Sequence, residues 1–516
     1  MFQPVHGGLL NFPLKGYGGK ISMLFLTALL PIAAIVVGMA GLNYPSKVMA
    51  PVGWIIAFAS SLFVFGASTE ALLTTSWAGV LDGARIVWLI FAAFSLLTVM
   101  LRSGAMDSVK LGLSGVTLDK RLMVLLLAVP FGTFLEGAAG AGAPAALAAP
   151  FLVGLGMNPV VAAAACLIGN SAPVSWGGAG VTTVVGAGSA GLDFVAVSAM
   201  TGRMAALEYI VLPALIILFV FGGKALRGIW KDLLFLGFLM GAINFTISNL
   251  LLSITELTSL LGGLAGTLVF SLWLKAKKEA DVPEEFRFAA PAKNGDAGER
   301  NLFQSLLPYF ILSALLVTVR LSFPLKTLVS FGGGYTVWVG CVVLISAAVA
   351  ALLFGTWKGL PSAAMDAFKR VIPALLAMGF LLAMVNCMRL SGQISTLAKT
   401  LSAGAGFLYP MAAVLIGQIG AFVTGTNLGS NLMFNPLHIE AAKNLSLNVI
   451  PIAAAQNTGG AIGNMICPNN VVAVCACVSI LGKEGEVMRK TLLPSLTLLL
   501  FLGILAMIYT YLVFPL

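Results

Sequence analysis

Apolar segments of about 20 residues recur along almost the whole chain, separated by short stretches rich in charge, Gly or Pro. A helix of about 20 apolar residues is long enough to cross the roughly 30 Å of hydrocarbon in a bilayer. The pattern therefore predicts an all-α polytopic membrane protein. We predict about twelve membrane crossings, at residues 21–41, 51–69, 80–101, 159–187, 205–223, 232–252, 258–274, 305–323, 335–356, 371–388, 449–481 and 491–515.

Two segments, 121–156 and 407–442, do not fit this pattern. Each consists of two apolar arms of roughly 15 residues joined by a tip of Gly and small residues. About 15 helical residues cover only about 22 Å, which is too short to span a bilayer comfortably. We therefore predict two re-entrant hairpins whose tips end inside the membrane.

Two of the predicted crossings, 159–187 and 449–481, are too long for one straight helix. Each contains a polar pair beside Gly or Pro, Asn170–Ser171 in the first and Asn457–Thr458 in the second. Non-helical backbone is tolerated inside a bilayer only where it is buried in protein or lines a polar cavity. Interrupted apolar segments at matching positions in two halves are the best sequence indication of a transporter's binding site.

A hairpin followed by a broken helix occurs once in residues 1–274 and once in 305–516, on either side of a polar loop at 275–304. When the loop after residue 101 is placed in the cytoplasm, the inside loops hold 20 Lys and Arg and the outside segments hold seven. Cytoplasmic loops collect positive charge, so this bias supports a cytoplasmic 275–304 loop and two outward-facing termini. Seven crossings separate the hairpins. They are therefore opposed, and the two halves form an inverted repeat.

Composition agrees with a membrane protein that has no separate soluble domain. The chain is 59% hydrophobic and 9% charged, with a mean hydropathy of +1.01. Its net charge of +10 is explained by the cytoplasmic loops. Because no basic stripe is interleaved with aromatic residues, we expect no nucleic-acid partner.

The sequence carries no pattern of an enzyme. The six Cys lie mostly in apolar segments and the chain has only two His, so we expect no metal and no cofactor. The Gly-rich stretch at 137–142 follows an apolar helical arm instead of a strand and has no Lys after it, unlike a nucleotide-binding loop. With no nucleophile–base arrangement either, we predict neither an enzyme nor an ATP-driven pump.

Helices that begin at the tips and breaks suit a small anion. Pro144 can open one returning arm, and Ser171 can cap the second part of the first broken helix. Ser430 and Asn431 are placed to cap the other returning arm. Such N-termini present free N–H groups and partial positive charge, which favour carboxylates. The alternative is that the small residues serve close helix packing. The candidate substrate-binding residues are Gly140, Asn170, Ser171, Thr426, Asn427, Ser430, Asn457 and Thr458.

Glu136 is the only acidic residue at either hairpin tip. Ionisable residues within a membrane are functional candidates because burying them is costly. We predict that Glu136 is the proton-coupling group; the alternative is a structural carboxylate bonded to N–H groups of the tip. For His438, which follows the second tip, we prefer a structural role.

Three further charged sites have simpler explanations. Asp82 and Arg85 lie three residues apart on one helix face, so we expect an ion pair between them. Arg320 and Arg389 lie near helix ends, where a long side chain can reach the membrane surface. For Arg389, just before the second hairpin, a role in attracting an anion stays open.

Four stretches resemble signatures of the lactate permease family, which includes glycolate permeases. They are FLEGAAGAGAPAALAAPFLVGLGMNP, CLIGNSAPVSWGG, FVTGTNLGSN and AAQNTGGAIGNMICP, in the expected order, and the resemblance extends over essentially the whole chain. It implies a proton symporter that takes up L-lactate, D-lactate or glycolate across a bacterial inner membrane. More distantly, the chain resembles elevator-type transporters that pair two opposed hairpins.

The chain departs from this resemblance at three positions. Ala141 stands where well-known members carry Phe, Asn427 where some carry Asp, and Asn464 where some carry Lys. Losing an Asp and a Lys together leaves the local charge unchanged, so an anion can still bind. The smaller side chain of Ala141 leaves room for a bulkier 2-hydroxy acid.

Other functions stay open on the residues alone. Asn, Thr and Gly carbonyl groups of broken helices can coordinate sodium, so a sodium- or proton-coupled transporter of a sulfonate or dicarboxylate is the alternative. An anion channel is a further one. The sequence leaves the substrate's stereochemistry, the coupling ion and a homodimer undecided.

Overall fold

The computed structural model describes residues 23–38, 42, 44–140, 143–277, 282–288, 302–323 and 335–515. Over these ranges the chain is helical and has no strand, apart from an isolated β-bridge between Asp119 and Arg287. Ten of the described helices are long and apolar enough to cross a membrane, or eleven if one bent pair counts as a span. The prediction of an all-helical, multi-pass membrane protein is confirmed.

The count of twelve crossings differs from these ten for an identifiable reason. Three predicted crossings correspond to α1 (Met23–Val36), α2 (Ser46–Phe63) and α15 (Tyr335–Leu353), whose described apolar parts fall short of the ten spans. A fourth, 159–187, is the bent pair, which the ten do not include. Two of the ten spans, Lys120–Ala139 and Gln393–Thr424, include arms of the predicted hairpins. Length and composition therefore do not separate short crossings from hairpin arms.

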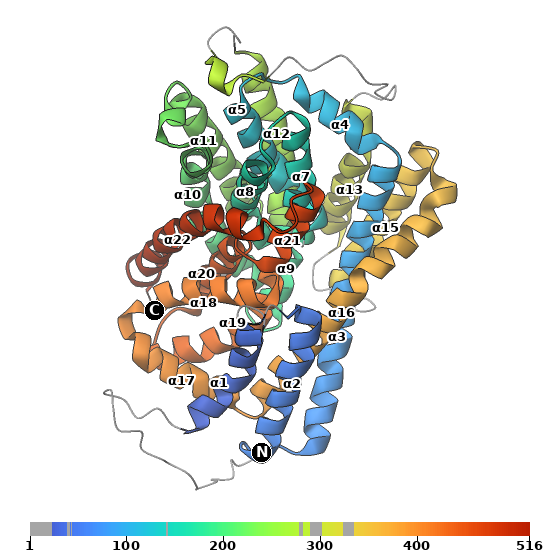
Figure 1. The fold of residues 1–516 in the computed structure, drawn as a ribbon. Coiled ribbons are helices and arrows are strands. Elements are labelled where there is room, and N and C mark those ends of the chain that lie inside the picture. Colours follow the sequence, from blue (N-terminus) through green and yellow to red (C-terminus); the bar gives the residue numbers. More distant parts are fainter. Residues whose placement is uncertain are drawn as a thin grey trace.

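Two long helices, α3 (Thr69–Arg102) and α16 (Leu360–Leu390), run side by side along one edge of the molecule (Figure 1). Glycines allow the close contact: a Cβ on Gly79 would lie 2.5 Å from the backbone N of Ala383. Helix α2 packs on α16 and α1 on α2, while α15 packs on α3. We call these five helices the outer group.

The remaining helices form an inner group, in which the predicted hairpins and breaks lie. Helix α13 (Leu302–Ser322) connects the two groups, since it packs on α15 and also on the turn η6 (Leu252–Leu257) that precedes α12. The longer helices of the inner group outside the hairpins and breaks are α10 (Phe194–Phe221), α11 (Trp230–Phe245), α12 (Thr258–Lys275) and α22 (Glu484–Ile508).

The order of elements repeats between the halves. A helix of 34 residues, α3, is followed by the short α4 (Ala105–Ser114), and a helix of 31 residues, α16, by the short α17 (Gln393–Ala405). A helix pair and a broken helix then follow in both. Both broken helices start at an Asn cap: Asn158 Oδ1 accepts from the N–H of Val160 at 3.0 Å, and Asn448 Oδ1 from that of Ile450 at 3.0 Å. The two halves thus share one order of elements.

The helix pairs differ from the predicted arms of equal length. In the first pair, α5 (Lys120–Leu126), the π-helical η2 (Leu127–Phe131) and α6 (Gly132–Ala139) join into one arm of 20 residues, whereas α7 (Ala143–Gly154) has 12. In the second, α18 (Tyr409–Thr424) has 16 residues and α19 (Asn427–Leu445) has 19. Arm length alone therefore does not require these pairs to be re-entrant. Of the first tip, Gly140 is described, and Ala141 lies outside the described residues.

The first break lies where it was predicted. Helix α8 (Pro159–Gly169) ends before Asn170 and Ser171, a short turn η3 (Ala172–Trp176) follows, and α9 (Gly177–Gly188) continues. The two parts are bent by 49°.

The predicted second break at Asn457–Thr458 is wrong. Helix α20 (Val449–Gly463) passes through both residues, and the break lies at 464–467, before α21 (Pro468–Cys477). Thr458 Oγ1 donates back to the carbonyl of Ala454 at 3.0 Å, which satisfies it within the helix. A Cβ on Gly459 would lie 2.1 Å from the carbonyl oxygen of Val414 on α18. The polar and Gly-rich run in α20 thus serves close helix packing, the alternative weighed from the sequence.

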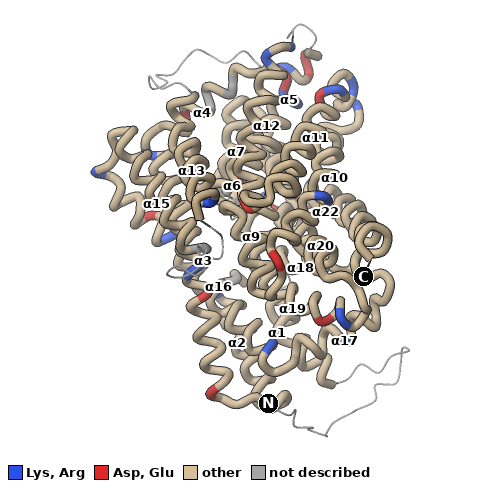
Figure 2. Tube along the Cα trace, turned by 180° about the vertical axis from the view of Figure 1, so that it is seen from behind, with Lys and Arg blue, Asp and Glu red and all other residues tan. Residues whose placement is uncertain are grey.

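Charged residues are sparse, and many of them lie near helix ends and in the connecting segments (Figure 2). The predicted pair of Asp82 and Arg85 forms, with Nη1 2.7 Å from Oδ1. The prediction that Arg320 reaches the membrane surface is wrong: Arg320 is paired with Glu256 of η6, and their side chains are 9% and 1% exposed. A buried acidic partner on a neighbouring element holds the guanidinium inside. Arg389 is exposed, and its Nη1 donates to the carbonyl of Ser189 at 3.0 Å.

Candidate functional site

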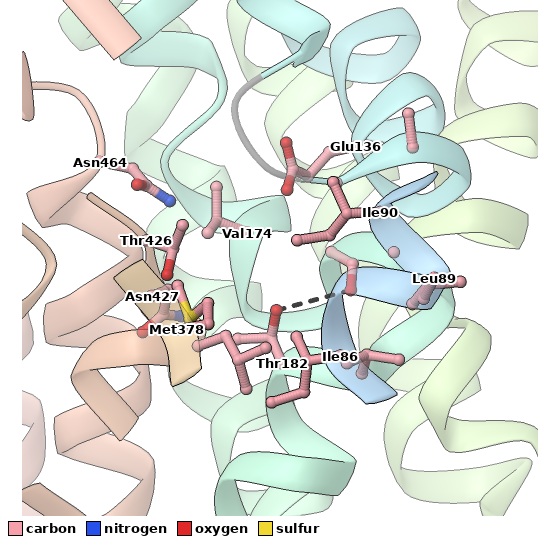
Figure 3. A pocket seen from close by; sticks show the side chains of 16 residues that line it. Ile86, Leu89, Ile90, Glu136, Val174, Thr182, Met378, Thr426, Asn427 and Asn464 are labelled. Atoms are coloured by element: carbon pink, nitrogen blue, oxygen red, sulfur yellow. Dashed lines mark hydrogen bonds between the residues drawn. The ribbon is translucent and has the colours of Figure 1, made fainter. Parts of the chain in front are cut away.

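A cavity opens where the first hairpin tip, both helix breaks and the start of α19 meet α3 and α16 (Figure 3). The space between its atoms amounts to about 550 Å³, its open mouth included. The described residues that line it include no Lys, Arg or His. Its polar side chains are Glu136, Thr182, Thr426, Asn427 and Asn464. Its other lining residues are Ile86, Leu89, Ile90, Ala139, Gly140, Val174, Gly177, Gly178, Val181, Met378 and Leu428.

Glu136, near the end of α6, is the only charged residue among the described residues that line this cavity. Its side chain is almost completely buried, with 1% of the residue exposed. Asn170 Nδ2, from the first break, donates to Glu136 Oε2 at 3.0 Å. The first hairpin and the first break, predicted to meet, are therefore joined at the carboxyl group.

Glycines let the first tip approach the break closely. A Cβ on Gly177 would lie 2.4 Å from Glu136 Oε1. A Cβ on Gly140 would lie 2.8 Å from the backbone N of Gly178, and Gly140 also has a left-handed φ of +64°. Both contacts are shorter than a Cβ atom tolerates. A larger side chain at Gly140 would push the tip away from the break, and one at Gly177 would displace the Glu136 carboxyl group.

The start of α9 is a left-handed turn beside the cavity. Gly178, Ala179 and Gly180 have φ values of 58°, 53° and 80°. For a residue with a Cβ, this conformation costs about 1–2 kcal/mol, so Ala179 is held there by its surroundings. The turn packs against η6, where a Cβ on Gly180 would lie 2.2 Å from the carbonyl oxygen of Glu256.

The second hairpin contributes the start of α19. Its N-cap is Thr426, whose Oγ1 accepts from the N–H of Gly429 at 3.0 Å, so the predicted caps Ser430 and Asn431 are wrong. The cap lies further back because Gly425, with a left-handed φ of +84°, ends α18 two residues before α19 begins. The N-terminus of this 19-residue helix borders the cavity with its partial positive charge.

A network of amide groups lies directly behind the cavity. Asn427 Nδ2 donates to Asn457 Oδ1 at 3.0 Å, and Asn431 Nδ2 donates to the same oxygen at 2.8 Å. Asn457 Nδ2 donates in turn to Thr183 Oγ1 at 2.9 Å. Asn457 thus connects the second hairpin with α9 without lining the cavity itself. Thr201 Oγ1, 3.3 Å from the same amide nitrogen, extends the network to α10.

The structure separates the eight candidate substrate-binding residues into three sets. Gly140, Thr426 and Asn427 line the cavity, and Asn170 and Asn457 hold residues that do. The remaining three contact other groups, and the predicted cap at Ser171 is not formed. Ser171 is hydrogen-bonded to Glu208, Ser430 is hydrogen-bonded to the carbonyl of Gly417, and Thr458 is hydrogen-bonded within α20.

His438 is completely buried away from the cavity. Its Nδ1 lies 2.9 Å from the hydroxyl of Tyr409, and its Nε2 lies 2.8 Å from Gln456 Oε1. The ring therefore bridges the start of α18 to α20.

The predicted site left out two polar residues: Asn464, which was considered only as a departure from the resemblance, and Glu208. Asn464 follows Gly463 in the second break as Asn170 follows Gly169 in the first, and this matching Gly-Asn pair marks the true break. Glu208 is the only acidic residue of α10, and it is buried. An acidic residue within a largely apolar helix is a functional candidate from the sequence alone. Its Oε1 accepts from Ser171 Oγ at 3.0 Å.

Among the described residues, no group of three or more His, Cys, Asp or Glu is arranged to hold a metal ion. The cavity's polar groups are an acid, two hydroxyls and two amides, which suit hydrogen bonding to a small polar ligand.

A family model and curated relatives match nearly the whole chain. The family model described as L-lactate permease matches residues 24–340 and 335–513. The glycolate permease GlcA of Escherichia coli K12 is 28% identical, over 96% of this chain and 97% of that protein. The L-lactate permease of Salmonella typhimurium LT2 is 29% identical, with the same coverage of 96% and 97%. Among solved structures, the YdaH transporter of Alcanivorax borkumensis is 16% identical with a TM-score of 0.44, over 85% of this chain and 87% of that one. Because the family model covers nearly all of it, the chain belongs to the L-lactate permease family and is a membrane transporter, not an enzyme.

Proposed function

We propose that this protein takes up a short 2-hydroxy monocarboxylate, such as lactate or glycolate, together with a proton across a bacterial inner membrane. The observation that carries the proposal is the cavity, in which Glu136 is the only charged lining residue among those described. The names of the relatives supply the substrate class, and their bacterial sources the membrane.

The polar groups of the cavity suit a carboxylate. Thr426, Asn427 and Asn464 offer hydroxyl and amide donors, and the N-terminus of α19 adds partial positive charge. Cations are not required for such a site, since N–H groups directed at an anion stabilise it.

The same cavity makes substrate and proton binding interdependent. Two carboxylates roughly 4 Å apart repel each other by about 4 kcal/mol at an effective dielectric constant of about 20. The substrate anion therefore binds when Glu136 is protonated, and release of the substrate favours release of the proton. One proton with one monocarboxylate carries no net charge, so this cycle is electroneutral.

The proposed movement is elevator-like. The two helix pairs are re-entrant hairpins that enter from opposite sides, and the halves 1–274 and 305–516 form an inverted repeat around the cytoplasmic 275–304 loop. The repeated order of elements and the matched Asn caps at α8 and α20 support this arrangement. The inner group then carries the cavity's polar groups past the outer group.

The test is counterflow in proteoliposomes that contain the purified protein, with labelled lactate outside and a panel of organic acids inside. We expect exchange with 2-hydroxy monocarboxylates, and accumulation driven by an inward proton gradient without sodium. Accumulation driven by sodium alone would contradict proton coupling. A steady current that does not saturate with substrate would identify a channel instead.

A further inference from the structure

The cavity has two chemically different faces. Its wall from α3 is made by Ile86, Leu89 and Ile90, and none of these side chains can form a hydrogen bond. The polar groups come from the hairpins and breaks of the inner group. In Figure 3, Ile90 extends into the cavity from α3, and Thr426 and Asn464 lie on the opposite side.

The apolar face belongs to a rigid part of the molecule. Ile86 and Leu89 are 3% and 5% exposed, so their positions are fixed by packing. One helical turn before Ile86, a Cβ on Gly83 would lie 2.6 Å from Gly379 of α16, which locks the two long helices together. A ligand must therefore fit the apolar wall as it stands.

This division orients a bound ligand. A carboxylate and a neighbouring hydroxyl find their partners on the polar face, and the rest of the molecule is directed at α3. A second carboxylate at that end would meet Ile86 and Ile90 and lose its hydration without a compensating donor.

We infer that Ile86 and Ile90 select for 2-hydroxy monocarboxylates with a short alkyl tail, above glycolate, which has none, and above 2-hydroxy dicarboxylates. The inference rests on the proposed function, because it assigns the tail of the substrate taken up through this cavity. Burial of each methylene group strengthens binding by about fourfold.

The experiment measures competition for exchange of labelled lactate in proteoliposomes that contain the full chain. The competitors are glycolate, lactate, 2-hydroxybutyrate, 2-hydroxyhexanoate and malate. We expect lactate to compete about fourfold and 2-hydroxybutyrate about 15-fold better than glycolate, with malate weaker than all of them.

Two variants of Ile90 test the assignment of the wall. Ile90→Ala should reduce the preference per methylene to less than about twofold and admit 2-hydroxyhexanoate. Ile90→Phe should weaken 2-hydroxybutyrate by at least about tenfold relative to glycolate, because the larger side chain fills the space of the tail. The matched control is Leu81→Ala on the same helix, since Leu81 is 42% exposed and does not line the cavity.

Equal competition by glycolate and 2-hydroxybutyrate in the unmodified protein would overturn the inference while leaving the proposed function intact. So would a ranking in both Ile90 variants that matches the Leu81→Ala control. Ile90 is only partly buried, which favours folding of its variants, and Ile86→Val gives a second, smaller change if Ile90→Phe does not fold. If no 2-hydroxy acid exchanges at all, the proposed function fails and the inference fails with it.

Discussion

Asn170 donates a 3.0 Å hydrogen bond to the carboxyl group of Glu136, although the two residues lie 34 positions apart and in different elements. The acid of the first hairpin is thus held by the break of the helix that follows it. Since Glu136 also lines the cavity, a change in its charge acts on both the ligand and the hairpin.

Glu136→Gln should separate exchange from coupling. The amide resembles the protonated acid in shape and cannot release a proton, so the substrate still binds while the proton no longer crosses. We expect uphill uptake driven by a pH gradient to be abolished and exchange between equal pools to persist. Both are measured in proteoliposomes. Accumulation with an unchanged pH dependence would exclude Glu136 as the coupling group.

Glu208→Gln should behave differently, although Glu208 is equally buried. Its carboxyl group is bonded to Ser171 and does not line the cavity, so it does not meet the substrate. An amide oxygen can still accept from Ser171. We expect pH-driven uptake to keep its rate within about twofold, with the same pH profile. Loss of coupling in this variant would show that a second acid takes part.

Asn457→Ala should weaken substrate binding from behind the cavity. It removes the side-chain acceptor that Asn427 and Asn431 share, so Asn427 keeps only its hydrogen bond to the backbone carbonyl of residue 457 and is held less firmly at the cavity. We expect a roughly tenfold loss of affinity, equivalent to about 1.4 kcal/mol, with the protein still folded in the membrane. Thr458→Ala is the matched control, because that hydroxyl bonds only within α20. Equal effects of the two substitutions would argue against the network.

Gly177→Ala should impair transport through a single methyl group. That group would lie 2.4 Å from Glu136 Oε1, so the buried carboxyl group or the hairpin tip that carries it has to shift, at a cost of about 1–3 kcal/mol. We expect uptake to be at least tenfold slower, since a factor of ten corresponds to about 1.4 kcal/mol, which lies within that cost. Gly188→Ala in the same helix, where the new Cβ meets nothing within 4 Å, should transport normally. Normal uptake by Gly177→Ala would mean that the tip is free to move.

Cysteine labelling tests the opposed hairpins. Cys341 and Cys477, the exposed cysteines among the described residues, are first replaced by Ser. Lys224→Cys should then react only with a reagent on the cytoplasmic side, and Lys399→Cys only with one outside. Labelling of both from the same side would rule out the inverted repeat.

The general architecture was predictable because membrane helices can be identified in a sequence by their length and apolar composition. The first break was equally clear, since Pro173, just after the Asn170–Ser171 pair, has no N–H group and would cost a regular helix one of its hydrogen bonds. The second break was misplaced because Gly459 and Gly460 look like helix breakers in sequence. In the fold these glycines allow α20 to touch its neighbours.

The sequence predicts some of the residues that line the cavity and not others. Glu136, Thr426 and Asn427 lie at tips that the sequence marks by small residues. Ile86 and Ile90 belong to an ordinary apolar helix, and only the tertiary fold brings that helix to the cavity. The partner of Arg320 could not be foreseen either, because Glu256 is 64 residues away in the chain.

The ion pair between Arg320 and Glu256 has a consequence for any large movement of this transporter. Removing one partner from a buried ion pair costs about 3–5 kcal/mol, and a movement that keeps the pair intact avoids this cost. Helix α13 should therefore move together with η6, although it also packs on α15 of the outer group. In the proposed elevator-like movement, the surface along which the two groups slide then lies between α13 and α15.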